Sequence, residues 1–447
     1  MKIPASVPAC ASEIVGSHDR PIVTIPDGRA LTRRELLGGL GAATAAAMVP
    51  SFAVGSHAQA ATRTQAATRT QAPVRTPGKG VLVMLTLYGG NDGLNTIVPT
   101  ADAVYTSVRG ATGLQAAQTL RIDDRFGFHP SLVGVKALFD QGKIGVVPGV
   151  GYPSPNRSHF RSMDIWQSAV PERVELTGWL GRWHDATGPD PIRMLSIGPS
   201  VPRMLVAATG GAGAIPNGNF TLPGGAAVTN AFTEAVRTPP SELGGWGSRI
   251  ATTGADLLRV GAQVGPVLKG GSAGAGGVNL EAGVVTGQQT SALDRQFGEV
   301  ALLIKANLPT RVFSVSLGGF DTHANELGNH ADLLGVVDRG ISKFLASIAA
   351  DPRANDVVVV VYSEFGRRVV PNLSYGTDHG TAGPVLVAGH GVRGGMHADY
   401  PSLSDLVDGD LRVTTDFRRV YSTVLEQVLG ADPAVSLGKR FDPLGFL

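Results

Sequence analysis

Cysteine is almost missing from this sequence. The only cysteine among its 447 residues is Cys10, close to the N-terminus. Disulfide bonds, cysteine-ligated metal sites and cysteine nucleophiles are therefore excluded from the rest of the chain. A metal site there has only carboxylate oxygens and imidazole nitrogens as strong ligands, which suit Zn²⁺, Mn²⁺, Mg²⁺ or Ca²⁺.

Charged residues are also scarce. They make up 17% of the chain, below the usual quarter, whereas 43% of the residues are hydrophobic and 60 are glycine. This composition indicates a compact, loop-rich globular protein. Four basic residues and no acid lie within 61–80, while the whole chain carries a net charge of only +2. The body from residue 81 onward is therefore slightly acidic, which argues against nucleic-acid binding.

Two common catalytic motifs have no support in this sequence. It contains no Gly-x-x-x-x-Gly-Lys-[Ser/Thr] loop, which argues against an enzyme that binds nucleotide phosphates in such a loop. The pattern Gly-x-Ser-x-Gly occurs at 270–274, but it lies in a glycine-rich stretch and does not follow an apolar strand pattern, which argues against a serine esterase.

The N-terminal segment has the pattern of an export signal. Arg33 and Arg34 precede a soft apolar stretch over 36–54, and a small-residue cleavage pattern follows at 58–60. We expect residues 1–60 to be a twin-arginine export signal, read by the twin-arginine machinery and then cleaved, which leaves no stable membrane span. An uncleaved membrane anchor is the alternative. The expected location is extracytoplasmic: periplasmic, in the cell envelope or secreted.

Residues 61–80 repeat Ala-Thr-Arg-Thr-Gln-Ala twice and end in a stretch rich in proline and glycine. This composition predicts a disordered basic linker, with contact to the cell envelope as an alternative role.

The body, residues 81–447, alternates between strand and helix patterns. Continuous apolar runs predict buried strands, and amphipathic stretches predict helices between them. This alternation predicts an α/β fold with a mainly parallel sheet covered on both faces. The glycine-rich stretches 209–226 and 270–287 are interpreted as loops around an inserted segment at about 200–290. The predicted strands are 81–87, 144–149, 311–317, 357–362 and 384–388, and the predicted helices are 158–168, 290–307, 332–349 and 416–429.

Polar residues that carry chemistry lie next to these apolar runs. Ligands in such sheets bind beyond the carboxyl ends of the strands, so these residues are expected to share one rim. Four groups follow strands, and Asp378 with His379 precedes the last one. The groups that follow strands are Asn91 and Asp92, then Ser158 and His159, then Asp321 and His323, and finally Glu364.

This set suits metal-assisted displacement at phosphorus or sulfur. Two ions about 4 Å apart would stabilise both the attacking and the leaving oxygen. Ser158 stands where a helix is predicted to begin, which favours an activated nucleophile, with a plain helix N-cap as the alternative. Arg157 or Arg367 would hold a further oxygen of the ester.

The motifs that contain these residues resemble the signature of a bacterial twin-arginine-exported family of unknown function within the alkaline phosphatase/sulfatase superfamily. The resemblance covers residues 81–430. It implies an alkaline-phosphatase-like α/β/α sandwich and metal-dependent phosphoryl or sulfuryl transfer. The motifs are Leu87–Thr96, Gly151–Pro153 with Asn156–Ser162, Gly319–His323, Ser363–Arg367 and Gly376–Gly380.

The resemblance also implies roles for single residues. Asp92 resembles a metal-binding aspartate at the end of the first strand, and Ser158 resembles the nucleophile. Asp321, His323 and His379 resemble the ligands of one metal. Asp378 is expected either to bind the metal or to support an imidazole.

Glu364 and Phe365 depart from the superfamily pattern, which has Ser-Asp-His-Gly at this strand end. Glu364 would replace the aspartate as a ligand of the second metal, but Phe365 cannot bind one. The position that a sulfatase needs for its modified cysteine or serine holds Pro153, which argues against that subclass.

Two functions remain open at this point. One is an exported metal-dependent hydrolase of phosphate or sulfate esters, acting on a small-molecule or glycan ester through Ser158 at a centre of one or two metals. The other is a non-catalytic exported binding protein with a degenerate metal site. The expected metal ligands are Asp92, Asp321, His323, Glu364, Asp378 and His379.

Overall fold

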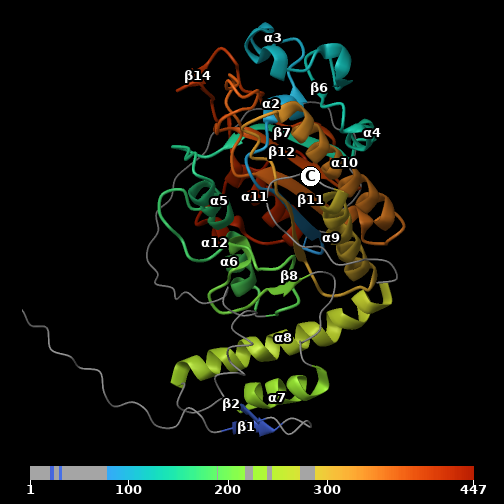
Figure 1. Ribbon diagram of the computed structural model, residues 1–447, viewed down its shortest axis with the longest axis vertical. Coiled ribbons are helices and arrows are strands. Elements are labelled where there is room, and N and C mark those ends of the chain that lie inside the picture. Colours follow the sequence, from blue (N-terminus) through green and yellow to red (C-terminus); the bar gives the residue numbers. More distant parts are fainter. Residues whose placement is uncertain are drawn as a thin grey trace, which may run out of the picture. The chain divides into compact units, whose positions relative to one another are not determined.

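A computed structural model describes residues 78–188, 190–216, 225–238, 244–271 and 287–447, together with strands β1 (Pro21–Thr24) and β2 (Ala30–Thr32) (Figure 1). The chain divides into two units, one made of Met1–Met48 and Leu222–Ala251 and the other of Val49–Thr221 and Thr252–Leu447. The first unit contains the antiparallel pair of β1 and β2 and helix α7 (Gly225–Arg237). Apart from β1 and β2, the predicted export signal (residues 1–60) lies outside the described residues, and so does the predicted linker up to residue 77.

The second unit is built on a nine-stranded sheet. Its strand order is β13-β7-β12-β11-β3-β10-β8-β9, and β16 pairs with β7 beside that path. Every strand pair is parallel except the two that involve β12. The strands are β3 (Val81–Leu87), β7 (Ile144–Gly151), β8 (Met194–Ile197), β9 (Gly213–Ile215), β10 (Val312–Leu317), β11 (Val357–Ser363), β12 (Gly383–Ala388), β13 (Gly395–Met396) and β16 (Thr415–Asp416).

Strand β3 lies at the centre of this sheet and explains why the apolar runs become strands. All seven of its residues are buried, and successive side chains point to opposite faces. Leu87 pairs with Leu317 of β10 on one side and with Ser363 of β11 on the other. The three strands therefore end at the same level, and the loops that follow them emerge side by side.

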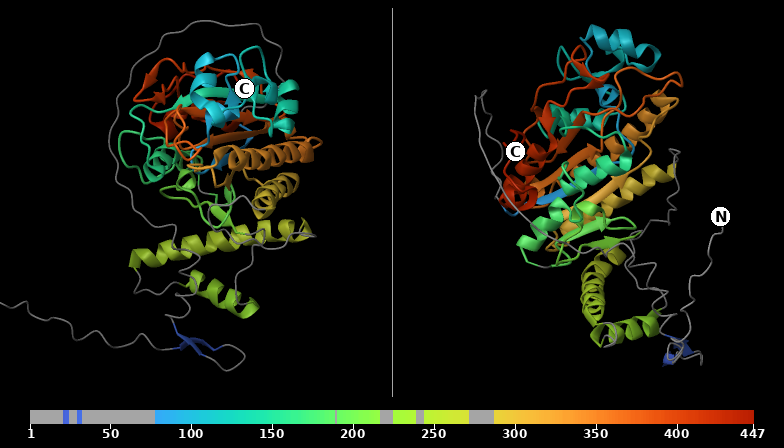
Figure 2. Two further views of the ribbon diagram at one scale, coloured as in Figure 1. Left: turned by 45° about the horizontal axis from the view of Figure 1, so that its top comes forward. Right: turned by 90° about the vertical axis from the view of Figure 1, so that its left-hand side faces the viewer.

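Helices cover both faces of the sheet, as the sequence predicts (Figure 2). One face packs against α4 (Val133–Asp140), the second half of α8 (Gly244–Gly271), α9 (Gly287–Lys305) and α10 (Glu326–Ile348). The other packs against α5 (His159–Ser168), α6 (Trp179–Ala186), α11 (Phe417–Val424) and α12 (Pro433–Leu437). The predicted α/β/α sandwich is therefore confirmed.

Strand β12 is the antiparallel member of the mainly parallel sheet. It runs antiparallel to both β11 and β7. The cause is the connection from β11, because residues 364–382 contain no helix, and a parallel return would need a crossover, usually a helix. The reversal has a consequence for the site. The start of β12, with Asp378 and His379 before it, lies at the edge where the parallel strands end.

The predicted helices are present with shifted ends. α10 begins at Glu326, before its predicted start, and the last predicted helix continues from α11 as a π-helical turn, Leu425–Leu429, before Gly430. Asp416 caps α11 by accepting a hydrogen bond from the backbone nitrogen of Arg418. Within the glycine-rich stretch 209–226, residues Gly213–Ile215 form strand β9 instead of a loop.

Smaller elements follow β3. They are α2 (Gly93–Thr96), α3 (Ala103–Arg109) and a small antiparallel sheet of β4 (Ile97–Val98), β5 (Leu120–Arg121) and β6 (Gly127–Phe128). A further pair, β14 (Leu406–Val407) and β15 (Asp410–Leu411), follows β13. Over the described part of the chain, none of the helices has the length and apolar character needed to cross a membrane.

Candidate metal centre

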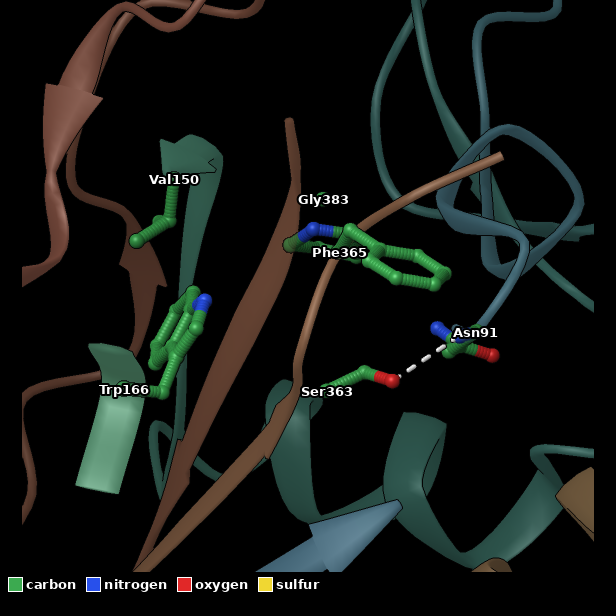
Figure 3. A pocket seen from close by; sticks show the side chains of 7 residues that line it. Asn91, Val150, Trp166, Ser363, Phe365 and Gly383 are labelled. Atoms are coloured by element: carbon green, nitrogen blue, oxygen red, sulfur yellow. Dashed lines mark hydrogen bonds between the residues drawn. The ribbon is translucent and has the colours of Figure 1, made fainter. Parts of the chain in front are cut away.

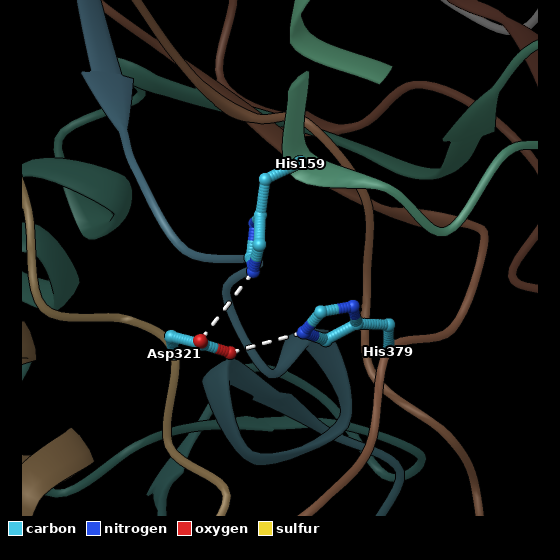
Figure 4. Close-up of side chains that lie close together, drawn as sticks. All are labelled: His159, Asp321 and His379. Carbon is cyan, nitrogen blue, oxygen red and sulfur yellow. Dashed lines mark hydrogen bonds and ion pairs between the residues drawn. The ribbon is translucent and has the colours of Figure 1, made fainter. Parts of the chain in front are cut away.

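Four segments that are distant in sequence meet at the carboxyl edge of the sheet. They are the start of α5, the loop after β10, the end of β11 and the loop before β12. Three of their side chains, His159, Asp321 and His379, have ligand atoms within 4.8 Å of one another (Figure 4). Among the described residues, these histidine and carboxylate side chains are the group that is close enough together to hold a metal ion.

The Asp321 carboxylate is the centre of this group. Its Oδ1 lies 3.0 Å from His323 Nε2 and 3.1 Å from His379 Nε2, and its Oδ2 lies 3.4 Å from His159 Nε2. The Nε2 atoms of His323 and His379 are themselves 3.0 Å apart. The structure therefore brings together three of the residues predicted from the sequence and adds His159 to them.

The other ring nitrogen of each histidine is held from behind. Nδ1 of His159 lies 2.8 Å from Glu364 Oε1, and Nδ1 of His323 lies 3.2 Å from Asp378 Oδ1. Nδ1 of His379 donates to the carbonyl of Arg157 at 2.8 Å. These partners accept hydrogen bonds, so they place the proton of each neutral ring on Nδ1 and leave Nε2 with a free lone pair. Metal-binding histidines are typically supported in this way.

The surroundings of the group shift the pKa values of its side chains. Partial burial would raise the pKa of Asp321, but the hydrogen bond from Arg367, together with the contact with His379, lowers it to about 2. Desolvation lowers the pKa of His379, whereas the hydrogen bond to Glu364 raises the pKa of His159. Near neutral pH the site thus offers an ionised carboxylate and at least one neutral imidazole.

Two glycines let the loops approach one another. Gly89 has a φ of +119°, and a Cβ atom there would overlap the backbone nitrogen of Asp321. A Cβ at Gly376 would overlap the backbone of His323. The Gly-Gly sequence after β3 and the glycine before Thr377 are therefore needed to bring the loops at 88–90 and 376–379 against the loop that carries Asp321.

Arg367 is buried beneath the group and joins three loops. Its guanidinium donates to the carbonyls of Gly89, Gly90, Phe320 and Thr377, and to Asp321 Oδ1 at 2.7 Å. The side chain has no exposed surface. The sequence suggested that Arg367 holds an ester oxygen, but this placement fits a residue that holds Asp321 instead.

Arg157 and Ser158 flank the group at the start of α5. The Arg157 side chain is 41% exposed and pairs with the buried Asp410, and its carbonyl accepts from His379. Ser158 is the N-cap residue of α5, but its hydroxyl makes no capping hydrogen bond. The exposed hydroxyl of Ser158 thus lies at the positive end of a helix without a capping bond. Its neighbours in the sequence are Arg157 and His159, the latter a member of the candidate metal group.

Asp92, in contrast, is engaged elsewhere. Its carboxylate forms a bidentate pair with Arg109, at 2.6 and 3.0 Å, and also caps α2 through the backbone nitrogen of Leu94. Both charged side chains are completely buried. Burial alone would raise the pKa of Asp92, but the charge and hydrogen bonds of Arg109 lower it. Asp92 therefore has no oxygen turned toward the group at Asp321.

Two further buried residues near Asp92 had no clear signal in the sequence. Glu326 has no exposed surface, and burial, followed by the charge of Asp92, raises its pKa to about 8. His330 Nε2 donates to Asn91 Oδ1 over 2.9 Å, and burial lowers the pKa of His330 to about 3. The apolar period of α10 identified its packing face, but it carries no information about polar partners from another loop.

Glu364 and Phe365 contact the imidazoles but do not supply a set of ligands for a second metal ion. Oε1 of Glu364 accepts from the backbone of Gly89 and faces His159. The Phe365 ring packs against His159 and His379, and it also lines a small pocket with Asn91, Trp166 and Ser363 (Figure 3). With Asp92 paired to Arg109, this geometry favours a centre for one ion.

Comparison with known proteins agrees with these motifs. Residues 288–433 match the model of a family described as "Protein of unknown function (DUF1501)", and this range contains three of the motifs, at 319–323, 363–367 and 376–380. No curated protein matches the chain.

Several solved structures are similar to this one. A protein in the alkaline phosphatase superfamily from Vibrio parahaemolyticus has 12% identity and a TM-score of 0.39, covering 84% of this chain and 77% of that one. The lipoteichoic acid synthase LtaP from Listeria monocytogenes has 9% identity and a TM-score of 0.35, with coverages of 82% and 76%. The soluble domain of lipooligosaccharide phosphoethanolamine transferase A from Neisseria meningitidis has 10% identity and a TM-score of 0.34, covering 83% of this chain and 96% of that one. These are likenesses in fold alone.

Proposed function

We propose that this chain is an exported metal-dependent hydrolase of phosphate or sulfate esters with one divalent cation. His159, Asp321 and His379 would hold the ion, with His323 as a further ligand. The proposal rests on one observation. The Nε2 atoms of His323 and His379 and Asp321 Oδ1 lie 3.0–3.1 Å apart, and the partners on the Nδ1 side leave no ring proton between them. Lone pairs at this distance repel one another unless a cation or an added proton lies between them.

The donor set narrows the choice of ion. Imidazole nitrogens suit Zn²⁺ and other transition metals, whereas Mg²⁺ and Ca²⁺ prefer oxygen ligands. Of the ions that the sequence left open, Zn²⁺ and Mn²⁺ therefore fit these residues best. When bound, the ion would supply a Lewis acid for an oxygen of the ester and for the negative charge that develops there.

Ser158 is the proposed nucleophile. Its exposed hydroxyl is free of a capping bond, and the amino end of α5 stabilises negative charge at this position. Arg157, partly exposed beside it, is the proposed partner of an ester oxygen. Arg367 and Asp378 act through other residues, the first through Asp321 and the second through His323. The substrate class is a small-molecule or glycan ester.

Export forms part of the same proposal. Residues 1–60 would direct the chain to the twin-arginine machinery and be removed, and the linker 61–80 would precede the folded body. A chain without cysteine in its body folds independently of disulfide formation, and it can acquire its metal before export.

Metal content is the first test. The mature chain, residues 61–447, is dialysed against Zn²⁺, Mn²⁺, Mg²⁺ or Ca²⁺ and analysed for bound metal. We expect one Zn²⁺ or Mn²⁺ per chain, lost in His379→Ala and retained in the control His390→Ala, whose ring bonds to the carbonyl of Leu345 away from the site. Equal binding by both variants would contradict the centre.

Turnover tests the nucleophile. With the metal-loaded chain and aryl phosphates or aryl sulfates as probes, Ser158→Ala is expected to lose at least about 10³-fold in kcat, as removal of a catalytic nucleophile usually does. The exposed hydroxyl makes no capping bond, so stability and metal content should stay within error. Unchanged turnover in Ser158→Ala would exclude this role.

The second candidate is a non-catalytic exported binding protein with a degenerate metal site. It is favoured by the Asp92–Arg109 pair and by Phe365, which together remove ligands that a second ion would need. A metal-loaded chain without turnover of any phosphate or sulfate ester would favour this function.

A further inference from the structure

Glu364 was expected to bind a metal, but its surroundings point to another task. The residue is 1% exposed. Its Oε1 accepts from the backbone of Gly89 at 2.8 Å and lies 2.8 Å from His159 Nδ1, and its Oε2 lies 3.0 Å from the Ser363 hydroxyl. Both carboxylate oxygens are therefore occupied by groups of the protein.

The contact with Glu364 fixes the state of His159. Because Oε1 also receives the Gly89 amide, it acts as an acceptor, and the proton of a neutral imidazole is placed on Nδ1. Nε2 is buried, has no hydrogen-bond partner and lies 3.4 Å from Asp321 Oδ2. The lone pair of His159 thus faces the carboxylate at the centre of the site (Figure 4).

Phe365 completes this arrangement by packing. Its ring centroid lies 5.0 Å from that of His159 and 4.8 Å from that of His379. Phe365 is itself held by Gly90, where a Cβ atom would overlap the ring. Rotation of either imidazole would require this packed ring to move, so the two histidines are restricted by shape as well as by hydrogen bonds.

We propose that Glu364 is a positioning residue, which holds His159 with Nε2 directed at Asp321 and does not itself bind the ion. This inference rests on the proposed metal centre, but its tautomer part stands without a metal. Glu364 and Phe365, at the end of β11, would then share one role: they orient the imidazoles of His159 and His379, which other segments supply.

The chain offers a matched comparison. Asp378 supports His323 through the same kind of contact, at 3.2 Å, but the Asp378 side chain is 57% exposed and that of His323 44% exposed. Water competes with such an exposed pair, so its removal should weaken binding less than the removal of Glu364. The Glu364 carboxylate is almost completely buried, so water does not readily replace it beside the partly exposed His159.

Cobalt titration tests the effect on the metal. Co²⁺ is added to the chain as a coloured substitute for Zn²⁺ and followed by its visible absorption. Glu364→Ala should weaken binding about 10–100-fold with an unchanged stoichiometry, as is typical for the loss of a group behind a metal-binding histidine. Glu364→Gln keeps an acceptor and the shape and should fall between wild type and Glu364→Ala, whereas Asp378→Asn should weaken binding less than Glu364→Ala does.

Nitrogen NMR of ¹⁵N-histidine-labelled, metal-free chain supplies a second readout. Glu364 raises the pKa of His159, so the spectra are recorded at a pH high enough to keep the ring neutral. In wild type, His159 is then expected as the Nδ1–H tautomer, and in Glu364→Ala as a mixture. Denaturation midpoints show whether Glu364→Ala folds, and the near-isosteric Glu364→Gln stays informative if it does not. Loss of one bound Co²⁺ per chain in a folded Glu364→Gln variant would show that Glu364 is a ligand, and would overturn the inference. An unchanged tautomer together with unchanged affinity in Glu364→Ala would also overturn it. If wild type binds no Co²⁺, the proposed function fails, and the tautomer alone decides the role of Glu364.

Discussion

The buried guanidinium of Arg367 donates a 2.7 Å hydrogen bond to Oδ1 of Asp321, the same oxygen that faces His323 and His379. Oδ1 of Asp321 is thus held by the permanent positive charge of Arg367, while the imidazoles of His323 and His379 also lie against it. The carboxylate is held before any ligand arrives, which lowers the entropic cost of binding an ion.

Replacement of Arg367 by lysine should weaken both the fold and the site. Lysine keeps the charge but cannot reach the four carbonyls and the carboxylate that the planar guanidinium contacts. We expect a loss of about 3 kcal/mol in the free energy of unfolding, because buried acceptors lose their partners. Urea denaturation measures it, and Co²⁺ titration measures the accompanying loss of affinity.

The neighbouring Arg368 provides the control for this change. Its side chain is 35% exposed and lies 3.8 Å from Asp410, so Arg368→Lys should leave stability and metal affinity nearly unchanged. Equal effects of the two substitutions would mean that the buried hydrogen bonds of Arg367 do not contribute more to stability and metal affinity than the exposed contact of Arg368.

Gly89 should not tolerate a side chain. Its φ of +119° is unfavourable for any other residue, and a Cβ atom would overlap the backbone of Asp321 and Phe320. We expect Gly89→Ala to destabilise the fold by about 2 kcal/mol or more and to reduce metal binding through displacement of Asp321. Thermal unfolding and Co²⁺ titration report the two effects.

Gly318 is the matched control for Gly89. It lies at the same rim, its φ is outside the left-handed region, and a Cβ atom there would meet nothing within 4 Å. Gly318→Ala should therefore have the stability and affinity of wild type. Normal metal binding by Gly89→Ala would show that the loop can move away without displacing Asp321.

Much of the architecture could be predicted from local patterns. The apolar runs at 81–87, 311–317 and 357–362 become neighbouring parallel strands because a fully buried strand needs apolar residues on both faces. Residues after such strands must share an edge, which is why Asp321 and His323 could be placed in advance. His379 was placed at the same rim, and β12 brings it there because this strand runs antiparallel to its neighbours.

The partners within the site could not be predicted in this way. Whether Asp92 faces an ion or Arg109 depends on how α3 folds back, and no local pattern encodes that contact. The sequence likewise could not distinguish Glu364 as a ligand from Glu364 as the support of His159, because both need a carboxylate at the same strand end. Long-range contacts between side chains decide these roles.

The stability of the fold should depend on pH through Glu326. Burial and the charge of Asp92 raise its pKa to about 8 from an ordinary value near 4.5. Between these values the folded chain binds a proton that the unfolded chain has released, so stability is lost as the pH rises from about 4.5 to 8. Glu326→Gln mimics the neutral acid at every pH. It should match wild type near pH 4.5 and exceed it by a few kcal/mol near pH 8, on the scale of about 1.4 kcal/mol per pKa unit.

Urea denaturation of both proteins at pH 5 and pH 8 checks the role of Glu326. The difference between variant and wild type cancels contributions from other groups, including His330, whose lowered pKa acts in the opposite direction. An equal difference at the two pH values would show that Glu326 is ionised in the folded chain.

The pair of Asp92 and Arg109 should contribute to folding and not to metal binding. Asp92→Asn alone leaves the completely buried Arg109 without its counter-charge, which typically costs about 3–5 kcal/mol. The double substitution Asp92→Asn with Arg109→Met removes both charges and should recover most of that loss, since a buried pair is often replaceable by apolar groups. Because the oxygens of Asp92 contact Arg109 and Leu94, both variants, where folded, should still bind one Co²⁺ per chain with wild-type affinity. Loss of a bound ion in the double variant, measured by the same titration, would instead assign Asp92 to a metal and restore the two-ion centre that the sequence left open.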